Sequence, residues 1–126
     1  MPIDVKIVPA REFLRTNTKG EFDLEGTRKV FLSIFEKMKE AEVSEVVMDV
    51  REASAQLSAF QIYELVSVLE HVGCRRTWKI ALVLSRKDEF DRAKFFELCA
   101  QNRGYQVGAF QDFEEAVTWL YPSKEP

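Results

Sequence analysis

Apolar residues alternate with charged ones over residues 3–7, at the start of the chain. A period of two is typical of a strand with one buried face. Pro9 ends this strand, and residues 11–18 predict a second one, closed by a turn at residues 19–20. Because a short segment separates the two strands, we expect them to pair as an antiparallel hairpin.

Apolar residues then recur every three or four positions in four segments, which predicts four amphipathic helices. Asp23, Asp88 and Asp112 each stand where a helix N-cap belongs, and Ser58 with Gln61 fits a capping box. A glycine follows the second and third stripes, as expected at a helix C-terminus. The stripes are Val30, Phe31, Ile34, Phe35 and Met38; Ile62, Leu65, Val66, Leu69 and Val72; Phe90, Ala93, Phe96 and Ala100; and Ala116, Val117 and Leu120.

Three further apolar runs, at residues 46–50, 80–84 and 105–110, lie between these helices. A run that is apolar on both faces is typical of a central strand covered on both sides. The order β-β-α-β-α-β-α-β-α predicts an α/β fold with a mixed sheet of about five strands and helices on both faces. We interpret residues 1–121 as one domain and residues 122–126 as a disordered tail.

Composition excludes several classes of function. The chain has 126 residues and a net charge of -3, which argues against binding nucleic acid, since phosphate backbones require a dominant basic surface. Cys74 and Cys99 form no CxxC pair, and together with the single histidine, His71, they do not make a conventional zinc site. The start lacks the apolar core of a signal peptide, and no run of about 18 apolar residues is present. We therefore expect a cytoplasmic protein without a membrane span, a metal or a cofactor.

The carboxyl ends of the central strands are the best candidate site, because ligands of open α/β sheets bind there. Residues 49–58 and 85–88 follow the central strands as predicted loops and lead into helix N-termini, whose free amides favour an anion. The candidate binding and regulatory residues in these two segments are Asp49, Arg51, Ser54, Ser58, Ser85 and Arg86.

Each of these residues also has a structural interpretation. Ser58 fits a helix cap, Asp49 fits a role in holding the segment after its strand, and Arg51 and Arg86 fit surface pairs with nearby aspartates. No catalytic arrangement accompanies them, since His71 lies in the last turn of a helix, where a cation suits the helix dipole. The glycines match no nucleotide-binding motif, so we expect no enzymatic activity.

The sequence resembles the STAS/anti-sigma-factor-antagonist-like superfamily, in particular its bacterial SpoIIAA-like branch. The resemblance extends over nearly the whole chain and depends on the element order, on the strand at residues 46–51 and on the C-terminal part. The fragments that carry it there are residues 90–96, 102–104, 109–110 and 114–120.

The resemblance implies a regulatory function. In regulatory members, a partner kinase phosphorylates a serine that opens the helix after the central strand. Ser58 occupies the similar position here, with Ser54 as a loop alternative, although Leu57 stands where those members place an Asp. We therefore expect a non-enzymatic regulatory module that binds a protein partner. Pairing of two copies of the chain as a homodimer is compatible with this expectation. The alternative is a carrier or sensor of a lipid or other small apolar ligand held between helices and sheet.

Overall fold

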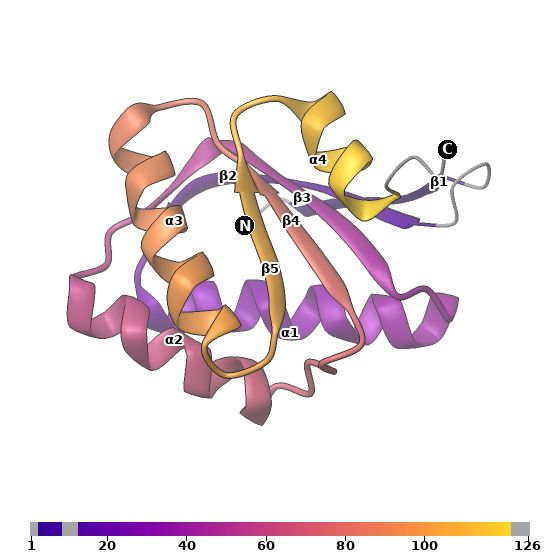
Figure 1. The fold of residues 1–126 in the computed structure, drawn as a ribbon, viewed down its shortest axis with the longest axis horizontal. Coiled ribbons are helices and arrows are strands. Elements are labelled where there is room, and N and C mark those ends of the chain that lie inside the picture. The colour runs from indigo at the N-terminus through magenta and orange to yellow at the C-terminus, as the bar shows by residue number, and fades with distance from the viewer. Residues whose placement is uncertain (1–2, 9–12, 122–126) are drawn as a thin grey trace.

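The computed structural model describes residues 3–8 and 13–121, with side chains described from residue 13 onward. The strands and helices follow one another in the predicted order (Figure 1). They are β1 (Ile3–Val8), β2 (Phe13–Phe22), α1 (Leu24–Ala41), β3 (Glu45–Ala55), α2 (Ala59–His71), β4 (Lys79–Val83), α3 (Lys87–Gln101), β5 (Gln106–Phe110) and α4 (Phe113–Leu120). The predicted α/β class is confirmed. The predicted tail at residues 122–126 lies outside the described residues.

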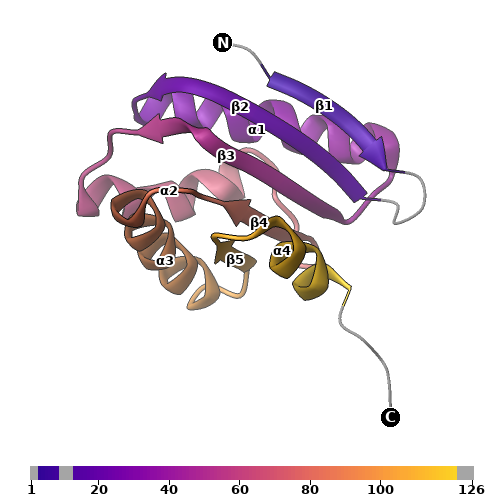
Figure 2. The same cartoon turned by 90° about the horizontal axis from the view of Figure 1, so that it is seen from above.

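The described strands form one sheet in the order β1-β2-β3-β4-β5. β1 pairs with β2 in antiparallel fashion, as expected of the opening hairpin, and the other neighbours are parallel. The helices lie on both faces of this sheet (Figures 1 and 2). Residues of α1, α2 and α3 share one buried cluster with Val46 and Met48, whereas α4 packs on Val47. Alternation along β3 thus separates a large core from a small one.

Local side-chain contacts fix where the helices begin. The predicted N-caps Asp23 and Asp112 are confirmed, since the carboxylate of each accepts a hydrogen bond from a backbone amide in the first turn. The predicted N-cap at Asp88 is wrong. α3 begins two residues earlier than predicted, with Arg86 as its N-cap, and Asp88 lies inside the first turn, where its carboxylate accepts from the Glu89 amide.

The predicted turn at residues 19–20 is also wrong, because β2 continues to Phe22. Gly20 has a φ of 110°, a conformation that favours glycine, but it remains paired with Ala53 of β3. Phe22 pairs with Ala55 and is buried in the large core. Pairing with a long neighbouring strand therefore outweighs the local turn signal of Gly20.

β3 is longer than predicted and carries an irregularity in its middle. The segment predicted as a loop after Asp49 is strand up to Ala55. Asn17 pairs with Asp49 but Lys19 pairs with Glu52, so β3 holds one extra residue at this point. Such a bulge reverses the alternation of side chains along the strand.

None of the helices in the described part of the chain has the length and the apolar character that crossing a membrane requires.

Candidate functional site

The six residues predicted from the sequence lie near the carboxyl ends of the strands but do not form one site. Asp49, Arg51 and Ser85 are linked to one another by hydrogen bonds. Ser54 belongs to a second network, which connects β3 to α3. Ser58 caps α2. The sixth residue, Arg86, pairs with Asp88 at the exposed start of α3.

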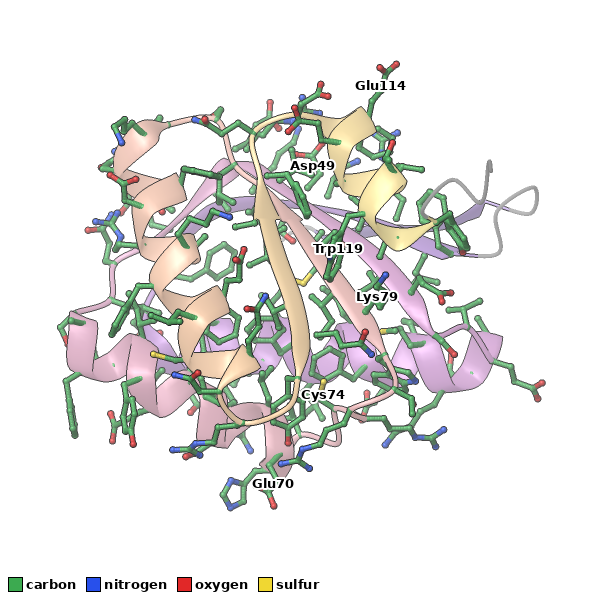
Figure 3. All side chains as sticks on the ribbon, viewed as in Figure 1. Asp49, Glu70, Cys74, Lys79, Glu114 and Trp119 are labelled. Carbon is green, nitrogen blue, oxygen red and sulfur yellow. The ribbon has the colours of Figure 1, made fainter. Side chains whose placement is uncertain are left out.

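Asp49 is buried on the α4 side of the sheet, with an exposed fraction of 8% (Figure 3). Its carboxylate accepts hydrogen bonds from Arg51 Nε at 2.9 Å and Nη2 at 2.7 Å, and from the Arg51 backbone amide at 3.2 Å. Arg15, on β2, reaches the same carboxylate at 3.8 Å and lies over the ring of Phe113. The predicted structural role of Asp49 is thus consistent with its contacts, because the carboxylate binds Arg51 within the bulge and Arg15 on the neighbouring strand.

These contacts determine the protonation of the pair. The hydrogen bond from the Arg51 side chain lowers the pKa of Asp49, and it raises the pKa of Arg51. A carboxylate held ionised by two guanidinium groups is a poor proton acceptor near neutral pH. Ser85 adds a hydrogen bond from its hydroxyl to the Arg51 backbone oxygen at 3.2 Å, which ties the end of β4 to β3. The chemistry available here is positioning of the strand ends.

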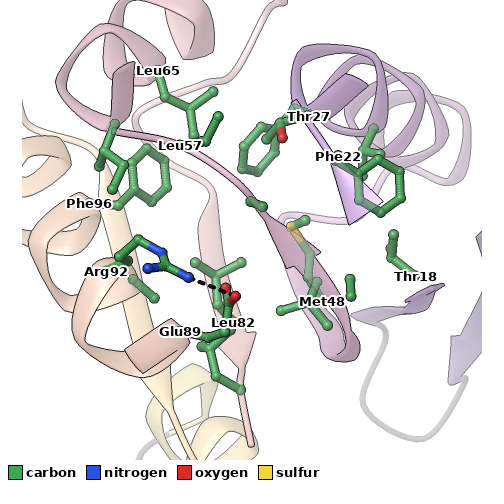
Figure 4. A pocket seen from close by; sticks show the side chains of 18 residues that line it. Thr18, Phe22, Thr27, Met48, Leu57, Leu65, Leu82, Glu89, Arg92 and Phe96 are labelled. Atoms are coloured by element: carbon green, nitrogen blue, oxygen red, sulfur yellow. Dashed lines mark hydrogen bonds and ion pairs between the residues drawn. The ribbon is translucent and has the colours of Figure 1, made fainter. Parts of the chain in front are cut away.

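Ser54 connects the end of β3 to a partly buried ion pair on α3. Its hydroxyl donates to Glu89 Oε2 at 2.7 Å and accepts from Gln56 Nε2 at 2.6 Å. Arg92 Nη2 donates to the same Glu89 oxygen at 2.8 Å (Figure 4). Glu89 has an exposed fraction of 8%, so this network satisfies a carboxylate inside the fold.

A pocket of about 120 Å³ lies next to this ion pair, between the sheet and helices α1, α2 and α3 (Figure 4). Its walls are almost entirely apolar, and the bulge in β3 supplies part of them. Met48, before the bulge, and Val50, within it, line the pocket, and Ala53 and Ala55 line it after the bulge. The small alanine side chains leave room beneath the strand. Helix residues that line the pocket include Val30, Phe31, Ile62, Leu65, Ala93 and Phe96.

The predicted capping box at the start of α2 is confirmed. Ser58 Oγ accepts from the Gln61 amide at 3.2 Å, and the Gln61 side chain accepts from the Ser58 amide at 3.0 Å. Ser58 itself is exposed. Two large side chains beside it are also exposed, Phe60 at 69% and Tyr63 at 50%. The outer face of this helix therefore presents a hydroxyl and two aromatic rings to solvent.

The sequence interpretation missed Glu89 and Arg92, whereas the pocket lies between helices and sheet, where the alternative interpretation placed an apolar ligand. A signal for Glu89 was present, because it lies four residues before Ala93, on the extension of the buried stripe of α3. A carboxylate on such a stripe indicates a partner from elsewhere in the fold.

The described residues hold no group of three or more His, Cys, Asp or Glu side chains suited to a metal ion. Burial raises the pKa of the Cys74 thiol to about 12, which disfavours the nucleophilic thiolate.

Comparisons with known proteins identify the fold. No family model matches the chain, and no curated protein matches its sequence. A solved structure of an uncharacterised DUF3478-family protein with a SpoIIAA-like fold, from Shewanella loihica PV-4, matches with a TM-score of 0.60 and 17% identity, over 94% of this chain and 93% of that one. The anti-sigma factor antagonist SpoIIAA, in its unphosphorylated form, matches with a TM-score of 0.51 and 13% identity, over 97% and 100%. The chain therefore has the STAS/SpoIIAA-like fold that its sequence resemblance implies.

Proposed function

We propose that this chain is a non-enzymatic regulatory module that binds a protein partner through the exposed start of α2. The observation that carries this proposal is the exposure of Phe60 and Tyr63, which occupy neighbouring positions on the first two turns of the helix. Large aromatic side chains held on a rigid element are typical of the residues that dominate binding energy in protein interfaces. The capping box fixes the start of the helix, so little conformational entropy is lost on binding.

Ser58 gives this surface a means of regulation. Its hydroxyl is exposed and lies at the helix N-terminus, where free backbone amides favour negative charge. Phosphorylation would add nearly two negative charges within a few residues of Phe60, and would thereby change the partner that the surface prefers. The similarity of the fold to SpoIIAA, an anti-sigma factor antagonist with an unphosphorylated form, supports this proposal. Ser54 is less suited, because its hydroxyl is engaged with Glu89.

Photo-crosslinking in cells followed by affinity measurement tests the proposal. A benzophenone amino acid at position 63 captures the partner, and the same group in place of Glu114, an exposed residue of α4, serves as the control. The captured protein is then purified and titrated with the unlabelled chain. We expect Phe60→Ser to weaken binding at least about thirtyfold, since an aromatic anchor contributes about 2 kcal/mol or more. Glu114→Ser leaves it unchanged. Equal affinity of wild type and Phe60→Ser would refute the proposal.

A second candidate function is the binding of a small apolar ligand, and the pocket between sheet and helices favours it. A cavity of about 120 Å³ is close in size to the apolar cavities of about 150 Å³ that hold benzene or xenon. Leu57, Ile62 and Leu65 line it from the inner side of the chain segment that presents Phe60 and Tyr63 outward. An apolar ligand in the pocket would thus lie against the helix that we propose as the partner surface.

Binding of benzene, followed through the methyl NMR signals of Leu65 and Leu82, tests this second function. We expect saturable shifts in the wild-type protein and their loss in Ala55→Leu, whose larger side chain fills the pocket. Ala59→Leu is the matched control, because Ala59 is exposed on α2. Absence of shifts in the wild type, or equal binding in both variants, would exclude the pocket as a ligand site.

A further inference from the structure

Arginine residues at one end of the molecule differ from the other described arginines in lacking an acidic partner. Outside this end, each described arginine lies within 4.0 Å of a carboxylate oxygen: Arg15, Arg28, Arg51, Arg86 and Arg92. Within the described part of the chain, Arg75, Arg76 and Arg103 make no ion pair. In a chain with a net charge of -3, this distribution gathers at one end three arginines that no ion pair among the described residues engages.

The three arginines belong to one surface, which we name the basic pole. Arg75 and Arg76 follow the C-terminal end of α2, and Arg103 follows that of α3. Arg76 Nε donates to the Arg103 backbone oxygen at 2.9 Å, which brings the two segments together. Figure 3 shows this end of the fold, where Glu70 and Cys74 are labelled. It lies at the opposite end of the parallel strands from the pocket and from Ser58.

An aromatic ring holds each guanidinium group of the basic pole. Arg75 lies 5.4 Å from the Trp78 ring centre, Arg76 lies 4.4 Å from that of Tyr105, and Arg103 lies 5.4 Å from that of Tyr63. Trp78 and Tyr105 are buried, so these two rings are rigid supports. Stacking restricts the long side chains before any partner binds, which reduces the entropy lost on binding.

The hydrogen-bonding groups of these arginines remain largely available. Arg76 uses Nε and Arg103 uses Nη1, which donates to the Ser67 hydroxyl at 3.1 Å. In the described residues no hydrogen bond from the Arg75 guanidinium is present, and both terminal nitrogens of Arg76 are likewise free. A free guanidinium fork matches the two oxygens of a carboxylate.

We propose that the basic pole binds an acidic segment of a protein partner, through carboxylates that pair with Arg75, Arg76 and Arg103. The three arginines contribute a charge of +3, so the rest of the chain carries a net charge of -6. That charge repels a long polyanion such as nucleic acid beyond the pole, whereas a short peptide contacts the pole alone. The proposal goes beyond the α2 surface. Arg75 and Arg76 follow the other end of α2, and Arg103 adjoins the α2 surface at the Tyr63 ring.

Titration of the isotope-labelled full chain with a hexaglutamate peptide at low salt tests this inference. We expect saturable amide shifts confined to the residues around positions 75, 76 and 103, and weaker binding at higher salt. The variant Arg75→Gln/Arg76→Gln/Arg103→Gln should weaken binding at least about tenfold, because it removes three charge-assisted pairs. The matched variant Arg28→Gln/Lys37→Gln/Lys87→Gln removes the same charge elsewhere and should change binding less than threefold.

Further variants separate this inference from loss of folding and from the α2 surface. Arg75→Gln alone removes no hydrogen bond, so it keeps the fold and should still weaken binding about twofold to threefold. Phe60→Ser should leave hexaglutamate binding intact, whatever its effect on the α2 partner. Binding that is equal in wild type and the triple arginine variant would overturn the proposal. Tighter binding of a single-stranded DNA hexamer than of hexaglutamate would overturn it too.

Discussion

Replacing Asp49 by Asn tests how the strand ends are held together. The change removes the negative charge but preserves the size of the side chain and one oxygen for the Arg51 amide. Two hydrogen bonds from the Arg51 side chain, at 2.9 and 2.7 Å, lose their charged acceptor. Hydrogen bonds to buried charged groups contribute about 1.5–3 kcal/mol, but the Arg51 side chain is 42% exposed, so solvent screens the pair. We therefore expect a loss of about 1–2 kcal/mol in the free energy of unfolding at pH 7.

The same substitution has a defined pH dependence. The pKa of Asp49 is lowered in the folded protein, so the unfolded chain takes up the proton first as the pH falls. The stabilisation from the ionised carboxylate is therefore complete above the unfolded pKa of about 3.9 and is lost as the pH falls through the folded pKa. The difference between wild type and Asp49→Asn should narrow below about pH 4.

Urea unfolding followed by the fluorescence of Trp78 and Trp119, at pH 7 and at pH 3, measures both effects. Asp91→Asn is the control, because Asp91 pairs with Lys87 on the exposed face of α3. That pair should contribute less than about 0.5 kcal/mol. The account of Asp49 is refuted if Asp49→Asn changes stability no more than the control does, or if its effect at pH 3 equals its effect at pH 7.

Three other predictions follow from single contacts. Ser58→Ala should lower the free energy of unfolding by about 1 kcal/mol in urea titrations, because it removes the α2 cap, and an unchanged stability would contradict that role. Gly108→Ala should lower the free energy of unfolding by about 1–3 kcal/mol in the same assay, because an added Cβ would lie 2.8 Å from the Phe110 ring. An unchanged free energy of unfolding would show that this ring moves freely. The third prediction concerns Cys74, and it uses the Cys99→Ala variant at pH 8 so that only one thiol reacts. Iodoacetamide should modify Cys74 at least about a hundredfold more slowly in the folded than in the urea-unfolded protein, because burial raises the pKa of the Cys74 thiol to about 12. Equal rates in the two states would contradict this prediction.

The parts of the fold that depend on local patterns were predictable from the sequence. The capping box of Ser58 and Gln61 needs only a four-residue segment, and the apolar stripes mark the helix faces that pack on the sheet. The turn predicted at Gly20 was wrong because β2 gains pairing along the whole of β3, which a local pattern does not report. The extra residue in β3 is equally a property of two strands rather than one.

The candidate site was predictable only in part for the same reason. Asp49 and Arg51 are two residues apart, so their pairing was visible from the sequence. Ser54 and Glu89 are 35 positions apart, and their contact depends on how α3 packs over β3. The pocket is a space left by small side chains such as Ala53 and Ala55, and its position follows from the bulge. Such a space arises from tertiary packing and has no sequence pattern of its own.

The dissociation constant of the complex with the partner captured at position 63, measured for wild type and for Phe60→Ser, tests the proposed function most directly. Both proteins should show the same urea stability, since Phe60 is 69% exposed. A regulatory module that binds through α2 predicts a dissociation constant at least about thirtyfold higher for the variant. Identical dissociation constants would contradict the assignment of this helix as the partner surface.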